Sequence, residues 1–197
     1  MAMSDHQLKA LFSSEGLMSQ TLPAFRSRAG QIEFAEAIEA SLMQSVDSVI
    51  EAETGIGKSL GYLMPVLLSN KRVLISTYTK LLQDQIFYED LSIARTVLAS
   101  AKKVAVLKGR RNYLCPFKFA QLFESPSNRL PTEALAAVLE IKAWSTRTHT
   151  GDLSELEVLS ADVTDMITAS AEECQKRRCP NFDQCPLYNA RQQAELA

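Results

Sequence analysis

A glycine-bearing loop between two apolar segments constrains the fold of this chain more than any other feature. The stretch "SVIEAETGIGKSLGYLMPVLLS" passes from a short β-branched piece through "AETGIGKS", residues 52–59, into a helical pattern. The order strand, loop, helix lets successive backbone N–H groups and a helix N-terminus converge on phosphate groups. The stretch therefore predicts a phosphate loop, although Ala52 stands where the strict pattern has glycine.

The residues of the loop suit this chemistry. Gly55 and Gly57 allow the backbone to approach a phosphate closely, Lys58 can reach the β- and γ-phosphates, and the Ser59 hydroxyl can ligate Mg²⁺. The alternative is an ordinary glycine-containing turn that happens to precede Lys-Ser. The strand before the loop and the helix after it favour nucleotide binding.

The flanking segments extend the α/β pattern. "FRSRAGQIEFAEAIEASLMQ" has helical spacing, and "KRVLISTYT" and "KKVAVLKG" are typical of strands on either side of a helical "KLLQDQIFYEDL". Strands that alternate with helices predict a parallel sheet of the α/β class. After Gly109 the strand signal ends and helical segments follow, among them "TEALAAVLEIKAWSTR" and "LYNARQQAELA". We therefore expect an α/β unit over residues 1–108 and a mainly helical, cysteine-bearing unit over 109–197.

Composition is that of an ordinary globular protein, with 46% apolar and 22% charged residues. The longest apolar run is too short to cross a bilayer, and the N-terminus does not resemble a secretion signal. A cytoplasmic location is expected. In a reducing compartment, four cysteines are more often metal ligands or catalytic groups than disulfides.

Charge is unevenly distributed although the formal net charge is only −2. Residues 91–123 contain no carboxylate, and residues 133–173 contain nine carboxylates against two basic side chains. The basic side chains of the first band are Arg95, Lys102, Lys103, Lys108, Arg110, Arg111 and Lys118. The pattern indicates either a polyanion contact or a solvated face without a partner.

Three of the four cysteines lie in "ECQKRRCPNFDQCP", residues 173–186. Cys174 and Cys179 are separated by four residues and Cys179 and Cys185 by five, whereas 58 residues separate Cys115 from Cys174. Their charged and polar neighbours are not those of a buried core. A shared metal site is the interpretation that these residues favour.

Several motifs together resemble one family. "FRSRAGQ", "AETGIGKS" as motif I, "ISTYTKLLQDQ" as motif Ia, "LKGRRNYLC", and the three later cysteines with Pro180, Pro186 and Tyr188 follow one another as in DinG-type DNA helicases. These are bacterial, XPD-like members of helicase superfamily 2, and the chain is similar to the YoaA branch. The resemblance covers residues 23–197.

The resemblance implies a fold and a set of site residues. The fold would be a P-loop, RecA-like parallel sheet, the first part of a motor domain, carrying a mainly α-helical iron–sulfur insertion. Lys58 and Ser59 would be catalytic. ATP with Mg²⁺ would be bound by Arg28, Gln31, Thr54, Gly55, Ile56, Gly57, Lys58 and Ser59, with Gln31 reading the adenine edge. A [4Fe-4S] cluster would be held by Cys115, Cys174, Cys179 and Cys185.

The same resemblance implies single-stranded or forked DNA as a partner and unwinding in the 5′ to 3′ direction during repair or replication. The DNA contacts would be Thr77, Thr79, Gln83, Arg110, Arg111, Tyr113, Lys176 and Arg177. The Thr77 and Thr79 hydroxyls suit phosphate contacts, but "STYT" alone favours an ordinary helix N-cap. Lys108, Lys118, Phe117 and Phe119 could line the same path. We expect a monomer, with a replication or repair protein as a further partner.

Hydrolysis is not expected from these 197 residues alone. No apolar strand ends in the Asp-Glu pair that holds Mg²⁺ and orients water, and Glu89-Asp90 lies in a helical context. The uncapped end at "AELA" suggests a fragment, which we expect not to unwind DNA. Alternatives are a non-enzymatic iron–sulfur DNA- or partner-binding module, a CRISPR-associated DinG-like helicase, and a nucleotide kinase-like P-loop enzyme with a zinc site, although the cysteine spacing suits zinc less well.

Overall fold

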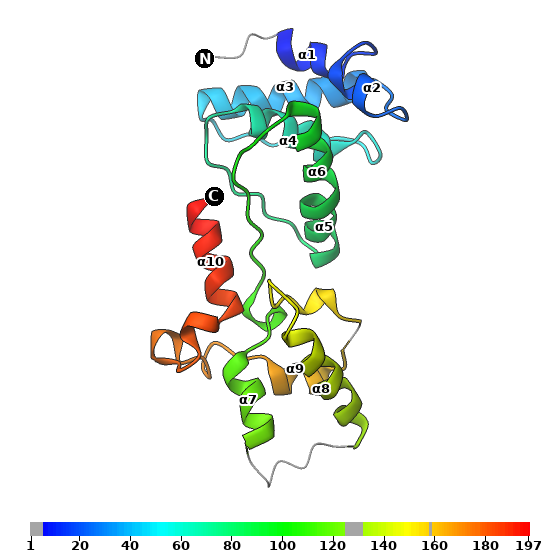
Figure 1. Cartoon of the computed structure of the whole chain (residues 1–197). Coiled ribbons are helices and arrows are strands. Elements are labelled where there is room, and N and C mark those ends of the chain that lie inside the picture. The colour runs from blue at the N-terminus through cyan, green and yellow to red at the C-terminus, as the bar shows by residue number, and fades with distance from the viewer. Residues whose placement is uncertain (1–5, 125–131, 158) are drawn as a thin grey trace. The chain divides into compact units, whose positions relative to one another are not determined.

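The computed structural model describes residues 6–124, 132–157 and 159–197, and the chain divides into two compact units, Met1–Lys102 and Lys103–Ala197. Helices form the regular structure of each unit (Figure 1). Within the described ranges, no helix is both long and apolar enough to cross a membrane. The sequence places the domain boundary after Lys108, which lies inside the second unit.

The first unit is built from α-helices and one π-helical segment. Its elements are α1 (His6–Phe12), α2 (Leu17–Thr21), α3 (Ala29–Gln44), α4 (Lys58–Leu68), α5 (Lys80–Asp84), η1 (Gln85–Asp90) and α6 (Leu91–Leu98). Helix α4 packs between α3 and α6, and α1 packs on α2 and α3. Phe12, Met18, Leu63 and Met64 are fully buried or nearly so and form the centre of this unit.

Helix α4 starts directly after the phosphate loop, as predicted, and is stabilised by its buried apolar face. Leu63, Met64, Pro65 and Leu67 are buried in this helix. Pro65 lies inside it, where a proline ring crowds the carbonyl of the residue four positions earlier. That residue is Gly61, which packs closely on the Phe34 ring of α3. The close α3–α4 contact therefore positions the loop against α3.

The predicted helix "KLLQDQIFYEDL" is confirmed and extends to Leu98. Helices α5 and α6 are joined without a break by η1, in which the backbone widens to a π-helix. Ile86, Leu91, Ala94 and Val97 are buried along this continuous helix. Such π segments are uncommon and occur often near functional sites.

The three segments predicted as strands form no β-strand in the described residues. The segments before the phosphate loop, before α5 and before Gly109 run as irregular chain. Val49 and Leu74, which a sheet would bury, are 103% and 93% exposed. The physical reason is that a strand requires a hydrogen-bonded neighbour, and consecutive strands of a parallel sheet need not be adjacent. The predicted sheet therefore stays a prediction.

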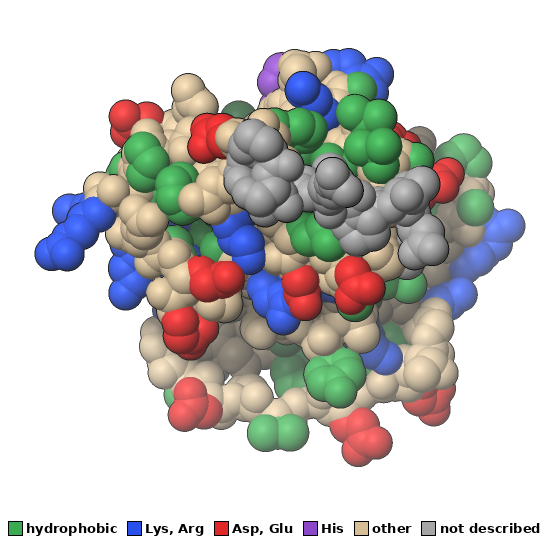
Figure 2. Space-filling model, turned by 90° about the horizontal axis from the view of Figure 1, so that it is seen from below, with side chains coloured by type: hydrophobic (Ala, Val, Ile, Leu, Met, Phe, Trp, Pro, Cys, Tyr) green, Lys and Arg blue, Asp and Glu red, His purple; other side chains and the backbone are tan. Residues whose placement is uncertain are grey.

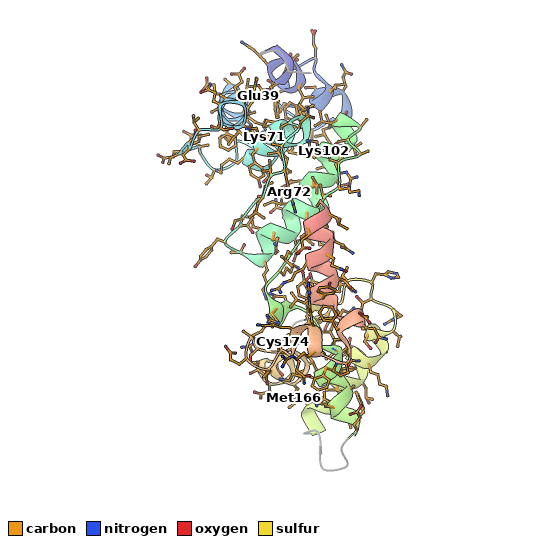
Figure 3. The ribbon with its side chains drawn as sticks, turned by 90° about the vertical axis from the view of Figure 1, so that its left-hand side faces the viewer. Glu39, Lys71, Arg72, Lys102, Met166 and Cys174 are labelled. Carbon is orange, nitrogen blue, oxygen red and sulfur yellow. The ribbon has the colours of Figure 1, made fainter. Side chains whose placement is uncertain are left out.

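The second unit is helical, as predicted. Its elements are η2 (Arg110–Asn112), α7 (Pro116–Glu124), α8 (Thr132–Ser145), η3 (Leu153–Glu155), α9 (Ala161–Ile167), η4 (Lys176–Arg178), η5 (Phe182–Gln184) and α10 (Pro186–Leu196). Helix α9 packs on α7 and α8 around Phe119, Val138, Ile141, Trp144 and Ile167. Met166, labelled in Figure 3, packs against this core.

Backbone hydrogen bonds connect the start of the second unit to its later parts. Tyr113 pairs with Asp152 in an isolated antiparallel bridge, and Leu114 N–H donates to the Gly151 carbonyl at 2.9 Å. Cys115 N–H donates to the Ile167 carbonyl at 2.8 Å. These bonds hold Cys115 at the N-terminus of α7 beside the end of α9.

Candidate nucleotide and cysteine sites

The phosphate loop has the backbone conformation that anion binding requires. Gly55 and Gly57 adopt φ values of 84° and 86°, which other residues rarely tolerate. Gly57 is the N-cap of α4 and has no side chain to accept hydrogen bonds from the first turn of that helix. An uncapped helix N-terminus offers N–H donors and a positive dipole to a phosphate.

Lys58 folds back over its own loop. Its Nζ donates to the carbonyl oxygens of Ala52 at 3.0 Å and Glu53 at 2.8 Å. Thr54 is exposed and Ile56 is half-buried on the same loop. To contact a phosphate, the Lys58 ammonium must exchange these two carbonyl oxygens for phosphate oxygens.

The structure brings Arg28 to Gly55 and Gln31 to Gly57 of the loop, 27 and 26 positions apart in the sequence. The Arg28 guanidinium donates to the Gly55 carbonyl, and Gln31 Nε2 donates to the Gly57 carbonyl at 2.9 Å. Gln31 is only 3% exposed, and a Cβ at position 57 would collide with its amide. The φ value of Gly57 favours glycine, and an added Cβ would also displace the Gln31 amide.

Tyr62 lies one turn after Ser59 on α4. Burial raises the pKa of Tyr62 above its ordinary value, the Ser59 side chain lowers it, and the nearby Asp90 carboxylate raises it. Asp90 ends η1, and its Oδ2 is buried with no hydrogen-bond partner in the described part of the chain. The Tyr62 hydroxyl therefore lies in a partly buried environment on which the Asp90 carboxylate acts.

The motif Ia residues form a capped helix start. Thr79 is the N-cap of α5, and its Oγ1 accepts a hydrogen bond from Leu82 N–H at 3.2 Å. Thr77 Oγ1 donates to the Thr79 carbonyl at 3.3 Å, and Gln83 lies in the first turns of the same helix. The N-cap expected from "STYT" alone is present. A DNA contact by these residues remains a prediction.

All four cysteines are free thiols and half-buried. Burial raises the pKa of the Cys115 thiol most, backbone N–H groups of Lys118 and Phe117 lower it, and Cys179 and Cys185 raise it. Cys115 is therefore near both of those thiols, although they lie far away in the sequence. Cys174, labelled in Figure 3, precedes η4 of the same unit.

The thiols fit an iron–sulfur cluster by their chemistry. No group of three or more His, Cys, Asp or Glu side chains among the described residues is placed to hold a single metal ion. A [4Fe-4S] cluster takes one thiolate on each iron, so its ligands stand farther apart than those of one ion. Four unpaired thiols in one unit, one of which receives backbone N–H bonds, match that ligand type.

The basic residues around the cysteines are only partly available to an anion. Arg111 pairs with Asp165, and Lys118 Nζ lies 3.0 Å from Glu173 Oε1. Basic and acidic side chains lie side by side on the face shown in Figure 2. Hydrogen bonds from its own backbone N–H and from Ser170 lower the pKa of the Glu172 carboxyl, and the charge of Arg110 lowers it further. Lys176 and Arg177 are exposed in η4 between Cys174 and Cys179.

Three residues predicted to line the DNA path are buried in this structure. Tyr113 is 4% exposed, and its hydroxyl accepts a hydrogen bond from Lys108 N–H at 3.0 Å. Lys108 is 5% exposed, and its Nζ lies 2.7 Å from Asp152 Oδ2 and 2.8 Å from Ser154 Oγ. Phe119 is also buried in the core. In this structure, none of the three has a face open to a base or a phosphate.

Sequence reasoning missed two sets of residues. The buried Lys108–Asp152 pair gives no local signal, because its members lie far apart in the sequence. Tyr62 and Asp90 were also missed. For Tyr62 a local signal exists, because its three-residue spacing from Ser59 places the two side chains on one face of the helix. That spacing could have identified Tyr62 beside the predicted Mg²⁺ ligand.

Comparisons with known proteins identify several relatives. No model of a known protein family matches the chain. It is 37% identical over 192 residues to the ATP-dependent DNA helicase YoaA of Haemophilus influenzae, covering 96% of this chain and 30% of that protein. It is 34% identical to YoaA of Escherichia coli, covering 93% and 29%. The 3'-5' exonuclease DinG of Bacillus subtilis is 35% identical, over 75% of this chain and 16% of that protein. The chain thus spans less than a third of the length of these relatives.

Proposed function

Because this chain is a DinG/YoaA-type helicase homologue over most of its length, we propose that it forms the nucleotide-binding and cysteine-bearing part of an ATP-dependent DNA helicase. Some of the relatives are named ATP-dependent DNA helicases. We assign DNA unwinding to the whole protein of which these 197 residues would be a part. For the 197 residues themselves, we propose binding of ATP with Mg²⁺ in the first unit. The RecA-like parallel sheet belongs to this proposal.

One observation carries the nucleotide site. The Gly55–Gly57 turn has positive φ at both glycines and leads without a side-chain cap into α4, with Lys58 and Ser59 in the first turn. Backbone donors and the Ser59 hydroxyl would then meet phosphates and their metal ion, and the Lys58 ammonium would join them on leaving the Ala52 and Glu53 carbonyls. Arg28, the N-cap of α3, and Gln31, within α3, donate hydrogen bonds to carbonyl groups of the loop. These bonds support the assignment of an adenine-binding side.

A [4Fe-4S] cluster in the second unit is the second part of the proposal. Cys115, Cys174, Cys179 and Cys185 would hold it, and it would join the chain around Cys115 to the chain after α9. Such a link closes a long loop in a small unit. Arg110, Arg111, Lys176 and Arg177, beside these cysteines, would then contact single-stranded or forked DNA together with Thr77, Thr79 and Gln83. Unwinding from 5′ to 3′ in repair or replication is proposed for the whole protein.

The names of the relatives differ in activity, but the chain matches them over a common segment. Some of these relatives are named helicases and others exonucleases. The function that both kinds of protein can share in this segment is the binding of nucleotide and nucleic acid. A nucleotide kinase with a zinc site would instead need a second phosphate acceptor and stoichiometric zinc. We therefore expect ATP binding without DNA unwinding from the 197-residue chain.

Binding of a fluorescent ATP analogue with Mg²⁺ to the full 197-residue chain tests this proposal. Lys58→Ala removes the ammonium that would contact the phosphates, so we expect affinity to fall about tenfold or more. Lys9→Ala, at an exposed position of α1, is the matched control and should bind like the wild type. Circular dichroism checks that both variants keep their helices. Absence of saturable binding by the wild type would contradict a nucleotide site. Binding by Lys58→Ala with the affinity of the wild type would also contradict it.

A further inference from the structure

Lys118 links the helix that begins after Cys115 to the segment that ends at Cys174. It lies in the first turn of α7, and its Nζ donates to the Asp165 carbonyl of α9 at 2.9 Å. The same Nζ lies 3.0 Å from Oε1 of Glu173, the residue directly before Cys174. An ammonium has three N–H donors, so it can satisfy both acceptors at once. One side chain therefore joins the surroundings of two cysteines that 58 residues separate.

Glu173 is held on its other side by Ser170. Its Oε2 accepts a hydrogen bond from Ser170 N–H at 2.8 Å, and its own N–H donates to Ser170 Oγ at 3.2 Å. This is the reciprocal pattern of a capping box, in which Ser and Glu three positions apart each bind the backbone N–H of the other. Both carboxylate oxygens of Glu173 thus have a donor. These bonds fix the backbone that leads into Cys174.

The backbone of Cys115 is attached to the same stretch of chain. Its N–H donates to the carbonyl of Ile167, a fully buried residue in the core of the second unit. Arg111 pairs with Asp165. We call these contacts of residues 111–118 with residues 165–173 the cysteine clasp. Every bond of the clasp joins two protein groups, so none of them requires a bound cofactor.

We propose that Lys118 and Glu173 are positioning residues that hold the chain around Cys115 and Cys174 in place before an iron–sulfur cluster binds. This inference rests on the proposed cluster. Thiolates on a chain that is already ordered lose less conformational freedom on binding than thiolates on free loops. The second unit therefore takes up its cluster in a folded state. Cys179 and Cys185, which follow the clasp in the sequence, complete the ligand set.

The Lys118–Glu173 pair is placed to affect the cluster more than the stability of the fold. Its side chains are 23% and 51% exposed, and ion pairs this open to solvent contribute little to the free energy of unfolding. Residues that orient the ligands of a metal, in contrast, change its affinity about 10- to 100-fold when they are mutated. Cluster retention and fold stability should therefore respond differently to the loss of Lys118.

The test measures iron release to a chelator from the anaerobically reconstituted 197-residue chain, followed by the absorbance of the cluster. Lys118→Met keeps the aliphatic stem and removes the ammonium, and we expect it to release iron about tenfold faster than the wild type. Lys118→Arg keeps the charge and should retain iron better than Lys118→Met. Lys142→Met makes the same change in α8 of the same unit, where the ammonium lies over the Phe123 ring, and is the matched control. It should release iron at the wild-type rate.

Two measurements on the iron-free chain test whether the clasp forms in advance. Hydrogen exchange should show protected amides at Cys115 and Glu173 in the wild type, and weaker protection of Glu173 in Lys118→Met. The midpoint of urea unfolding, followed by the fluorescence of Trp144 in the core of this unit, should be the same in both chains. Neither measurement depends on the loaded protein.

The outcomes separate this inference from the proposed cluster itself. If the wild type holds iron and sulfide and Lys118→Met releases them at the wild-type rate, the positioning role is refuted and the cluster stands. Faster release together with a clearly lower urea midpoint would assign Lys118 to the stability of the fold and would also refute the proposal. Freely exchanging amides at Cys115 and Glu173 in the iron-free wild type would contradict a clasp formed in advance. If the wild type holds no iron, the cluster and this inference fail together.

Discussion

Lys108 shows how a basic residue near a predicted DNA path can have an internal role. Its side chain is 1% exposed and that of Asp152 is 3% exposed, and they form a 2.7 Å ion pair. The Lys108 ammonium also donates to Ser154, and Asp152 Oδ1 accepts from Ser154 N–H at 3.0 Å. Each charge is thus compensated by hydrogen bonds as well as by its partner, which is the condition under which a buried pair is tolerated.

Removal of one member of this pair should destabilise the second unit. Lys108→Ala leaves the Asp152 carboxylate buried without its counter-charge, so we expect a loss of about 3–5 kcal/mol in the free energy of unfolding. Fluorescence of Trp144 during urea unfolding reports this, because Trp144 is the only tryptophan and lies in the core of this unit. Lys103→Ala, at an exposed position, is the control. Equal midpoints for both variants would show that the pair contributes little.

The same residues show what could be predicted at this scale. Lys58, Ser59 and the two loop glycines were identified because their chemistry depends on neighbours in the sequence. A DNA contact by Lys108 or Tyr113 stays a prediction, and the burial of both depends on Asp152 and on the core of the second unit. The identity of a residue gives its chemistry, whereas long-range packing determines whether that chemistry faces solvent.

At the scale of elements, α3 and α4 are held together by a close approach at Gly61. A Cβ at this position would lie 2.8 Å from Cδ1 and 3.3 Å from Cε1 of the Phe34 ring. The absence of a side chain allows α4 to pack tightly on α3, and α4 carries the phosphate loop at its N-terminus. The loop is therefore positioned by the contact between these two helices.

Gly61→Ala should weaken this contact. Alanine usually stabilises a helix interior by about 1 kcal/mol over glycine, but here we expect overpacking to dominate and to cost about 1–3 kcal/mol. Gly30→Ala, in the first turn of α3 with no atom within 4 Å of the added Cβ, is the matched control and should be neutral or stabilising. Hydrogen exchange of the α3 and α4 amides measures both. Increased protection in Gly61→Ala would contradict a tight contact.

Several helices, α3, α4, α8 and α10 among them, were predicted correctly, and strands were not confirmed, for a physical reason. The apolar spacing of α3, α8 and α10 is a local property, because each helix satisfies its own backbone. The segments before the phosphate loop and before α5 have the composition of strands. In the described residues they form no hydrogen-bonded ladder with a neighbouring segment. Strand pairing is nonlocal, so composition predicts a tendency and not a partner.

At the scale of the whole molecule, the chain consists of two units with separate cores and separate predicted ligands. The first contains the phosphate loop, and the second contains all four cysteines. Cys179 and Cys185 raise the pKa of the Cys115 thiol, although they lie far away in the sequence. The hydrogen bond from Cys115 N–H to the Ile167 carbonyl holds Cys115 beside the end of α9.

The iron–sulfur proposal is tested by metal content. Anaerobically purified chain should be brown, with broad absorbance at about 400 nm, and should contain iron and sulfide. Cys115→Ser should lose the absorbance and the iron, because one iron of the cluster then lacks its thiolate. We expect the ATP affinity of this variant to be retained, because its first unit is unchanged. Stoichiometric zinc without iron would contradict the cluster and favour a zinc site.

The π segment η1 also fixes the angular phase between the helices that it joins. Successive residues of an α-helix are about 100° apart around its axis. A π turn holds one residue more than an α turn, so η1 contains a residue that an uninterrupted α-helix would not need. Deletion of one residue from η1 would rotate α5, with the Thr79 cap at its start, by about 100° relative to the face of α6 that packs on α4. The direction of the motif Ia hydroxyls is thus set by the number of residues in this segment as well as by their type.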